Sequence, residues 1–166
     1  MPVPTADFIA GMRRLAGGVT IVTARLGDVR AGLTVTSVCS LTAEPPRLLA
    51  CVHRDADAHA LIVASGYFAL NVLTQSQQDL ADHFGGRDSS HGPSRFAVGR
   101  WITGSTGVPL LVDAAATFEC RVSETLTAST HTIFIGEVEG LQTVEDASGL
   151  VYHDRTYHRL DSSNLD

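Results

Sequence analysis

Apolar and polar residues alternate along several parts of the chain, as in a strand that has two different faces. The clearest case is the segment 31–36, in which Leu33 and Val35 alternate with Thr34 and Thr36. Segments rich in β-branched and aromatic residues predict strands at 19–24, 29–36, 48–52, 67–73, 115–126 and 131–144. The pattern of residues 150–160 is mixed.

Three segments have helical spacing instead. The first is predicted to begin at a Thr5 cap and to end at Gly17–Gly18, with one apolar side made of Phe8, Ile9, Met12, Leu15 and Ala16. The others are 56–64 and 75–84, each followed by a glycine that ends the helix. A polar loop at 87–94 comes next and is either functional or a mobile connection.

Many strands with few helices between them indicate a mainly β (α+β) protein, a closed and mostly antiparallel barrel with a few flanking helices. A parallel nucleotide-binding sheet would need regular alternation of strands and helices, which this pattern lacks. The 166 residues contain no repeat and no linker. We therefore expect one domain over residues 1–166, with 161–166 as a frayed polar tail.

Composition and charge disfavour several functions. The net charge is −6 and no basic run is present, which argues against a nucleic-acid partner. No apolar stretch is long enough to span a membrane. The chain also lacks the glycine-rich motifs of Rossmann and P-loop sites and the G-x-S-x-G motif of hydrolases.

The cysteines and histidines point to no metal site. Cys39, Cys51 and Cys120 have no CxxC spacing, which argues against a disulfide framework or a zinc site and favours a reducing cytoplasm. We expect them to be small buried residues, with Cys120 on the core face of a strand, and a catalytic thiol is the alternative. The histidine spacing fits no common metal pair.

Two runs carry the candidate chemistry. The strand that ends at Thr36 leads into Ser37 and Ser40, whose short hydroxyl side chains can hydrogen-bond a flat polar ring or a phosphate without adding charge. Turn formation is the alternative role for these residues. His131 opens a strand and shares a face with Ile133, where it either contacts a ligand or caps a turn.

Several motifs occur together in a fixed order along residues 8–160. They are LAGGVTIVTA (15–24), AGLTVTSVCSL (31–41) with Pro45 and Pro46, SGYFALNVL (65–73), Gln78 with LADHF (80–84), Arg95 with Phe96, Trp101, FEC (118–120), HTIFIGEV (131–138), and LVYH (150–153) with Tyr157. As an ordered set they resemble the short-chain flavin reductases of the FMN-binding split-barrel type. These are the reductase components of two-component flavin monooxygenases.

The resemblance implies an NAD(P)H-dependent reductase of FAD or FMN that works as a homodimer and supplies reduced flavin to a separate monooxygenase. The flavin-ring contacts that it implies are Thr34, Thr36, Ser37, Val38 and Ser40. The residues implied for the ribityl and phosphate side are Cys51, Val52, His53 and Arg54, and those for the far end are Phe84, Gly85 and Arg87. The residues implied for the nicotinamide pocket are His131, which positions the ring, with Tyr152, His153 and Tyr157.

The chain departs from the family pattern in two places. Asp55 and Asp57 stand where the family often has serine and threonine that hold phosphate, so the phosphate must depend on Arg54, backbone amides or a helix start. This implies a flavin that is a releasable substrate, with FAD favoured. Ser129 and Thr130 replace the family's Gly-Asp before the histidine, so NADH and NADPH both stay open.

Two other functions are compatible with the same fold. One is a flavin-binding electron-transfer protein without reductase turnover. The other is an oxidase of the pyridoxamine-phosphate class, which needs a basic phosphate clamp. Only 12 Lys and Arg residues are present, without an obvious cluster, which disfavours that second alternative.

Overall fold

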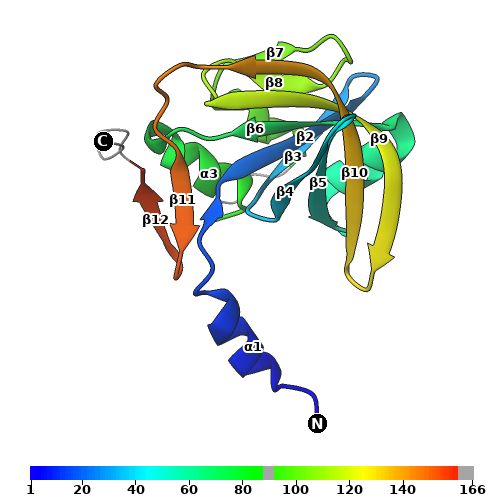
Figure 1. Cartoon of the computed structure of the whole chain (residues 1–166). Helices are drawn as coiled ribbons and strands as arrows, with labels where there is room; N and C mark the ends of the chain where they lie inside the picture. Colours follow the sequence, from blue (N-terminus) through cyan, green and yellow to red (C-terminus); the bar gives the residue numbers. More distant parts are fainter. Residues whose placement is uncertain (88–91, 161–166) are drawn as a thin grey trace.

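The computed structural model describes residues 1–87 and 92–160. Its main feature is a seven-stranded antiparallel sheet in the order β3-β2-β6-β9-β10-β5-β4, which curls around a core (Figure 1). The strands are β2 (Thr20–Leu26), β3 (Val29–Val35), β4 (Val38–Ala43), β5 (Pro46–His53), β6 (Tyr67–Val72), β9 (Ala116–Ala128) and β10 (His131–Thr143).

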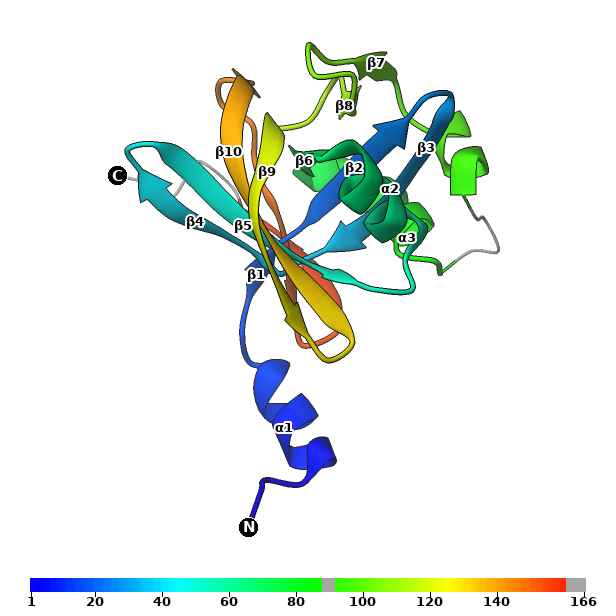
Figure 2. The same ribbon diagram turned by 90° about the vertical axis from the view of Figure 1, so that its right-hand side faces the viewer.

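The remaining elements surround this sheet. The short strands are β1 (Gly17–Gly18), β7 (Trp101–Thr103), β8 (Pro109–Leu111), β11 (Leu150–His153) and β12 (Thr156–Arg159). The helices are α1 (Thr5–Met12), α2 (Asp57–Ser65) and α3 (Gln78–Phe84), with 3₁₀ turns η1 (Gln75–Gln77) and η2 (Gly92–Ala97). No helix in the described ranges has the length and apolar character needed to cross a membrane. Figure 2 shows α2 and α3 against the barrel and α1 projecting away from it.

Alternate residues of the strands point into the barrel. In β5, Leu48, Ala50 and Val52 are buried, while the residues between them are partly exposed. They pack with Phe134 from β10 and with Ile62 from α2. Burial of one large apolar side chain contributes roughly 1.5–3 kcal/mol. This contribution fixes which face of each strand turns inward.

The barrel is split between its two edge strands. β3 and β4 follow each other in the chain, yet they lie at opposite ends of the strand order. Their inner side chains Leu33, Val35 and Val38 nevertheless pack against the same core. The predicted mainly β, mostly antiparallel split barrel is confirmed. The barrel is not closed by hydrogen bonds, because among the described strands β3 and β4 do not pair with each other.

Other predictions are corrected by the structure. The first helix ends at Met12, and Pro4 rather than Thr5 occupies the N-cap, without a side-chain cap. No strand was expected directly after Thr36, where Ser37 and Ser40 suggested a ligand contact or a turn, but Val38–Ala43 form β4 because their backbone pairs with β5. Cys120 is buried as expected, but Cys39 is exposed because β4 is an edge strand.

The irregular segments are only partly described. Residues 150–160 contain the β11–β12 hairpin, in which Tyr152 pairs with Tyr157. The end of the predicted polar loop forms η2. The rest of that loop, 88–91, and the predicted tail, 161–166, lie outside the described residues.

Candidate functional site

The outer face of the sheet carries several predicted site residues. Opposed residues on neighbouring strands share a face, and His131 of β10 is paired with His53 of β5, as Ile133 is with Cys51. On the other side of β5, Cys51 N donates to Ser37 O (3.0 Å) and Ser37 Oγ donates to Cys51 O (3.0 Å). Ser37, Cys51, His53 and His131 therefore form one band, which we call the outer strip.

A cleft of about 240 Å³ adjoins the Ser37 end of the outer strip. Its walls come from the end of β3, the loop after α3 and the β11–β12 hairpin. The residues that matter here are Thr34, Thr36, Gly85, Arg87, Tyr152 and Tyr157. The structure thus brings together residues predicted for the flavin and two tyrosines predicted for the nicotinamide. We call this space the tyrosine cleft.

Arg87 connects the two walls of the tyrosine cleft. Its Nη1 lies 2.9 Å from Asp82 Oδ1, and its Nη2 donates to the Tyr152 hydroxyl at 3.1 Å. The guanidinium lies 5.3 Å from the centre of the Tyr157 ring. Burial, with Asp82 nearby, raises the pKa of Tyr157 to about 12, so its hydroxyl stays protonated at neutral pH. Asp82 was not predicted as a site residue from the sequence.

The hydroxyl groups of the predicted cradle already have partners. Thr34 Oγ1 donates to Ala81 O at 2.8 Å, which fastens β3 to α3, and the Ser37 hydroxyl donates to Cys51 as described. Each hydroxyl hydrogen is used in one of these bonds, but the lone pairs of the oxygen can still accept a hydrogen bond from a ligand. The outer strip therefore offers neutral acceptors at this end.

Several predicted contacts point away from this surface. Val52 and Phe84 are 0% and 1% exposed, and Val38 packs against the barrel core. The Phe84 ring contacts Phe96 and Trp101 at centroid distances of 5.2 and 5.3 Å. Val52 and Phe84 can therefore offer a ligand only backbone atoms, and the half-buried Val38 side chain is turned towards the core. Ser40 is exposed but pairs with Leu48, on the other face of β4 from the outer strip.

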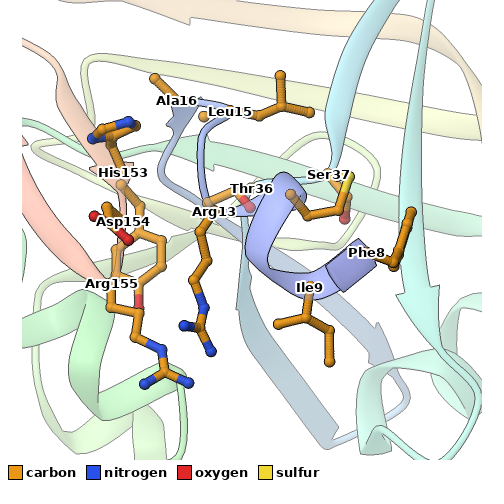
Figure 3. Close-up of a pocket in the computed structure, with 13 residues that line it drawn as sticks. Phe8, Ile9, Arg13, Leu15, Ala16, Thr36, Ser37, His153, Asp154 and Arg155 are labelled. Atoms are coloured by element: carbon orange, nitrogen blue, oxygen red, sulfur yellow. The ribbon is translucent and has the colours of Figure 1, made fainter. Parts of the chain in front are cut away.

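A second cavity of about 460 Å³ lies beneath α1. Figure 3 shows Phe8 and Ile9 on the helix, with Thr36 and Ser37 next to it and His153 across the space. The helix, although it projects away from the barrel, therefore shares this cavity with Thr36 and Ser37 at the end of the outer strip. His153 lines this cavity and not the tyrosine cleft.

A third cavity, of about 540 Å³, lies at the opposite end of the outer strip. Its lining residues are His53, Arg54, Asp55, His59, Ser129 and Thr130, and we call it the Arg54 pocket. Arg54 N donates to Thr130 O at 2.9 Å, and Asp55 N donates to His53 Nδ1 at 3.1 Å. His59 was not predicted from the sequence.

His131 stands beside the Arg54 pocket. Its ring lies edge-on to His53 with centroids 4.9 Å apart, and its Nδ1 is 2.9 Å from Thr130 Oγ1. In Figure 1 the β9–β10 turn and the β11–β12 hairpin lie on opposite sides of β4 and β5. Within one chain, the described residues therefore do not place His131 in one cavity with Tyr152 and Tyr157.

These features together define a class of protein. A split barrel with a neutral outer strip, an aromatic cleft at one end and a pocket that contains Arg54 at the other suits a long, flat ligand that carries a phosphate. The described residues include no group of three His, Cys, Asp or Glu placed to hold a metal. The arrangement is that of a flavin-binding split-barrel oxidoreductase.

The family match agrees with this class. Residues 12–161 match the family model described as "Flavin reductase like domain", and the chain belongs to this family. It is therefore an enzyme that reduces flavin with a nicotinamide donor.

Individual relatives match over nearly the whole chain. The chain is 43% identical to the "FMN reductase (NADH) RutF" of Stutzerimonas stutzeri, over 98% of this chain and 92% of the relative. It is 35% identical to the "4-hydroxyphenylacetate 3-monooxygenase reductase component" of Pseudomonas aeruginosa, over 92% and 90% of the two chains. Among solved structures, the "NADH:FAD oxidoreductase SgcE6" of Streptomyces globisporus superposes with a TM-score of 0.87 at 30% identity, covering 96% and 95%.

Proposed function

We propose that this enzyme uses NADH to reduce FMN as a released substrate and supplies the reduced flavin to a separate monooxygenase. The observation that carries the proposal is the continuity of the outer strip from the tyrosine cleft to the Arg54 pocket. Relatives named as FMN reductases and as a monooxygenase reductase component support the donor, the flavin and the partner.

The flavin is proposed to lie along the outer strip. Its ring lies beside Thr36, Ser37 and Cys51, and its phosphate reaches the Arg54 pocket. Cys51 and His53 are two residues apart in β5, about 7 Å along an extended strand. One molecule with a flexible chain between its ring and its phosphate can therefore span both ends.

Bound flavin supplies the hydride acceptor, so the protein needs little acid–base chemistry of its own. Its residues must hold the donor and acceptor rings roughly 3–3.5 Å apart and hydrogen-bond the flavin edge where negative charge develops. Thr36, Ser37 and nearby backbone amides are proposed for that edge. His131 is proposed to position the nicotinamide. Because Tyr152, His153 and Tyr157 line other cavities of the same chain, they are proposed to contact the nicotinamide from a second copy.

FMN is preferred here to FAD. The sequence favoured FAD because Asp55 and Asp57 would repel a tightly held phosphate, and this preference is not confirmed. The Asp55 side chain is 93% exposed, so water screens its charge. Relatives at 39–43% identity are named FMN reductases, which supports FMN as the substrate.

A homodimer in the cytoplasm is proposed as the working form. The apolar side chains of α1 are exposed in the single chain, which supports a second copy as their cover. The three cysteines are free thiols, which supports a reducing compartment.

An anaerobic assay tests the proposed reaction. The protein is mixed in catalytic amount with NADH or NADPH and with FMN or FAD, and bleaching of the visible flavin band is followed. We expect many turnovers, fastest with NADH and FMN. Bleaching of no more than one flavin per protein would instead support the electron-transfer protein. Faster turnover with FAD or with NADPH would overturn the corresponding preference.

A further inference from the structure

His59 occupies an unusual position in the Arg54 pocket. It lies in the first turns of α2, and its Nε2 is 2.8 Å from Thr132 Oγ1 on β10. Its ring packs against Phe134 with centroids 5.3 Å apart. His59 also lines, with Arg54, a neighbouring cavity of about 340 Å³. The side chain is therefore half-buried at the junction of two cavities.

The charges around His59 leave a phosphate with one fixed cation among the pocket-lining residues. Arg54 is the fixed cation among the pocket-lining residues, and His53 is a second titratable group. Asp55 in the pocket wall and Asp57 at the start of α2 are carboxylates. The neighbouring parts of β9 and β10 contribute the uncharged side chains of Thr125, Thr127, Thr132 and Phe134. Asp55, the carboxylate in the pocket wall, is 93% exposed and screened by water, so Arg54 is the one fixed charge among the lining residues that can hold a phosphate.

The protonation of His59 can change this balance. Burial, together with the positive charge of Arg54, lowers the pKa of His59 below its ordinary value of 6.5, so the ring is neutral at pH 7 without a ligand. A doubly negative group within a few ångströms has the opposite effect, because it stabilises the imidazolium. Water screens this attraction less at the half-buried His59 ring than it would at a fully exposed ring.

We propose that His59 is the second cation of the flavin-phosphate subsite: it takes up a proton as the phosphate enters and, with Arg54, makes the pocket specific for the phosphorylated flavin. The inference rests on the proposed function, in which the flavin phosphate occupies the Arg54 pocket. By linkage, a ligand that favours protonated His59 binds more tightly as the pH falls from the pKa of the bound state towards that of the free enzyme.

Riboflavin, which lacks the phosphate, provides the comparison. Dissociation constants of FMN and riboflavin are measured by fluorescence at about pH 5.5 and about pH 8, for the wild type, His59→Gln and the control His158→Gln. His158 is an exposed residue of β12, and it lines neither the tyrosine cleft nor the Arg54 pocket. The FMN phosphate itself titrates near pH 6, and His59→Gln isolates that contribution.

The preference for FMN is the ratio of the riboflavin dissociation constant to the FMN dissociation constant. At the lower pH, we expect this ratio to be about tenfold larger in the wild type and in His158→Gln than in His59→Gln. At the higher pH, this difference should be smaller. A histidine NMR titration of the wild type provides a second measurement. The His59 pKa should rise when FMN binds and stay unchanged when riboflavin binds.

The outcomes separate the inference from the function. If the enzyme reduces FMN but His59→Gln weakens both flavins equally, or the His59 pKa ignores FMN, the inference is wrong and the proposed function stands. If His59→Gln instead changes the preference for NADH over dihydronicotinamide riboside, the pocket serves the other substrate's phosphate and the inference is wrong. If neither flavin is bound or reduced, the proposed function itself fails.

Discussion

At the scale of single residues, His131 tests the assignment of the nicotinamide. Its exposed ring lies against His53 at the end of the outer strip. It is proposed to position a ring and not to transfer a proton, so His131→Ala should raise the apparent KM for NADH about tenfold, the loss of roughly one hydrogen bond. The KM for FMN should change far less. Steady-state kinetics with each substrate varied in turn measures both, and equal changes would remove the assignment.

Glu119 gives a prediction about stability. This buried carboxylate of β9 accepts hydrogen bonds from Thr106 N (2.8 Å), Thr106 Oγ1 (2.7 Å) and Ser105 Oγ (3.2 Å). It therefore holds the loop between β7 and β8. Glu119→Gln should cost about 1–3 kcal/mol, because charge-assisted hydrogen bonds are weakened. Thermal unfolding at pH 7 should show a drop of about 2–4 °C for each kcal/mol.

The pH dependence of this effect has a definite sign. Burial raises the pKa of Glu119, but the hydrogen bonds from Thr106 and Ser105 outweigh it and lower the pKa below the ordinary value of 4.5. A lowered pKa in the folded state gives stability that is present above the unfolded-state pKa and lost as the pH falls through the folded-state pKa. The difference in unfolding temperature between the wild type and Glu119→Gln should therefore become smaller below about pH 4. The control is Glu145→Gln, at an exposed position. A difference in unfolding temperature between wild type and Glu119→Gln that grows in acid would contradict this account.

Single residues show what sequence can predict. The alternation of Leu33 with Thr34 correctly predicted two faces, and the hydroxyl does lie on the outer one. The side chain of Val52 is buried although the resemblance implies Val52 as a contact, because the resemblance covers consecutive residues and does not say which side of a strand each occupies. His59 and Asp82 were missed because Thr132 and Tyr157, respectively, are brought close to them only by the fold. The His59 partner Thr132, for example, is 73 positions away.

At the scale of elements, Asn71 ties three strands together. It is fully buried in β6, donates to Ile21 O (3.0 Å) and Thr23 Oγ1 (3.1 Å) of β2, and accepts from Leu111 N (2.8 Å) of β8. Asn71→Ala would leave these buried groups unpaired, at about 1–3 kcal/mol each. We expect the urea unfolding free energy to fall by at least about 3 kcal/mol. Exposed Gln142→Ala is the control, and a loss for Asn71→Ala as small as the control's would show that water replaces the amide.

The elements that sequence predicted well are those with a strong local pattern. The strands at 19–24, 67–73 and 131–144 alternate or are richly apolar, and all are present. β4 was missed because its polar edge sequence resembles a turn and its strand form depends on pairing with β5. β7 and β8 are three residues each, too short for a periodic pattern, and β8 is held by the amide of Asn71.

At the scale of the whole molecule, α1 does not account for its own stability. It is eight residues long and contains no buried residue, and isolated helices shorter than about 12–15 residues are marginal in water. Phe8, Ile9 and Met12 are 58%, 45% and 47% exposed. The amphipathic pattern predicted the helix, but the described part of a single chain does not bury its apolar side chains. A second copy, packed on this helix, is the proposed solution.

If a second copy packs on α1, charged residues on this helix should weaken both the dimer and the binding of FMN. The double variant Phe8→Asp with Met12→Asp should be a monomer by light scattering at micromolar concentration, while the wild type is a dimer. Because α1 lines one cavity with Thr36 and Ser37 (Figure 3), the monomer should also bind FMN at least about tenfold more weakly, the effect of losing one wall of this cavity. Val144→Asp, an equally exposed apolar position away from α1, is the control. A double variant that stays dimeric, or a monomeric wild type, would show that α1 needs no partner. A monomeric variant with unchanged FMN affinity would separate assembly from the site and place the flavin wholly within one chain.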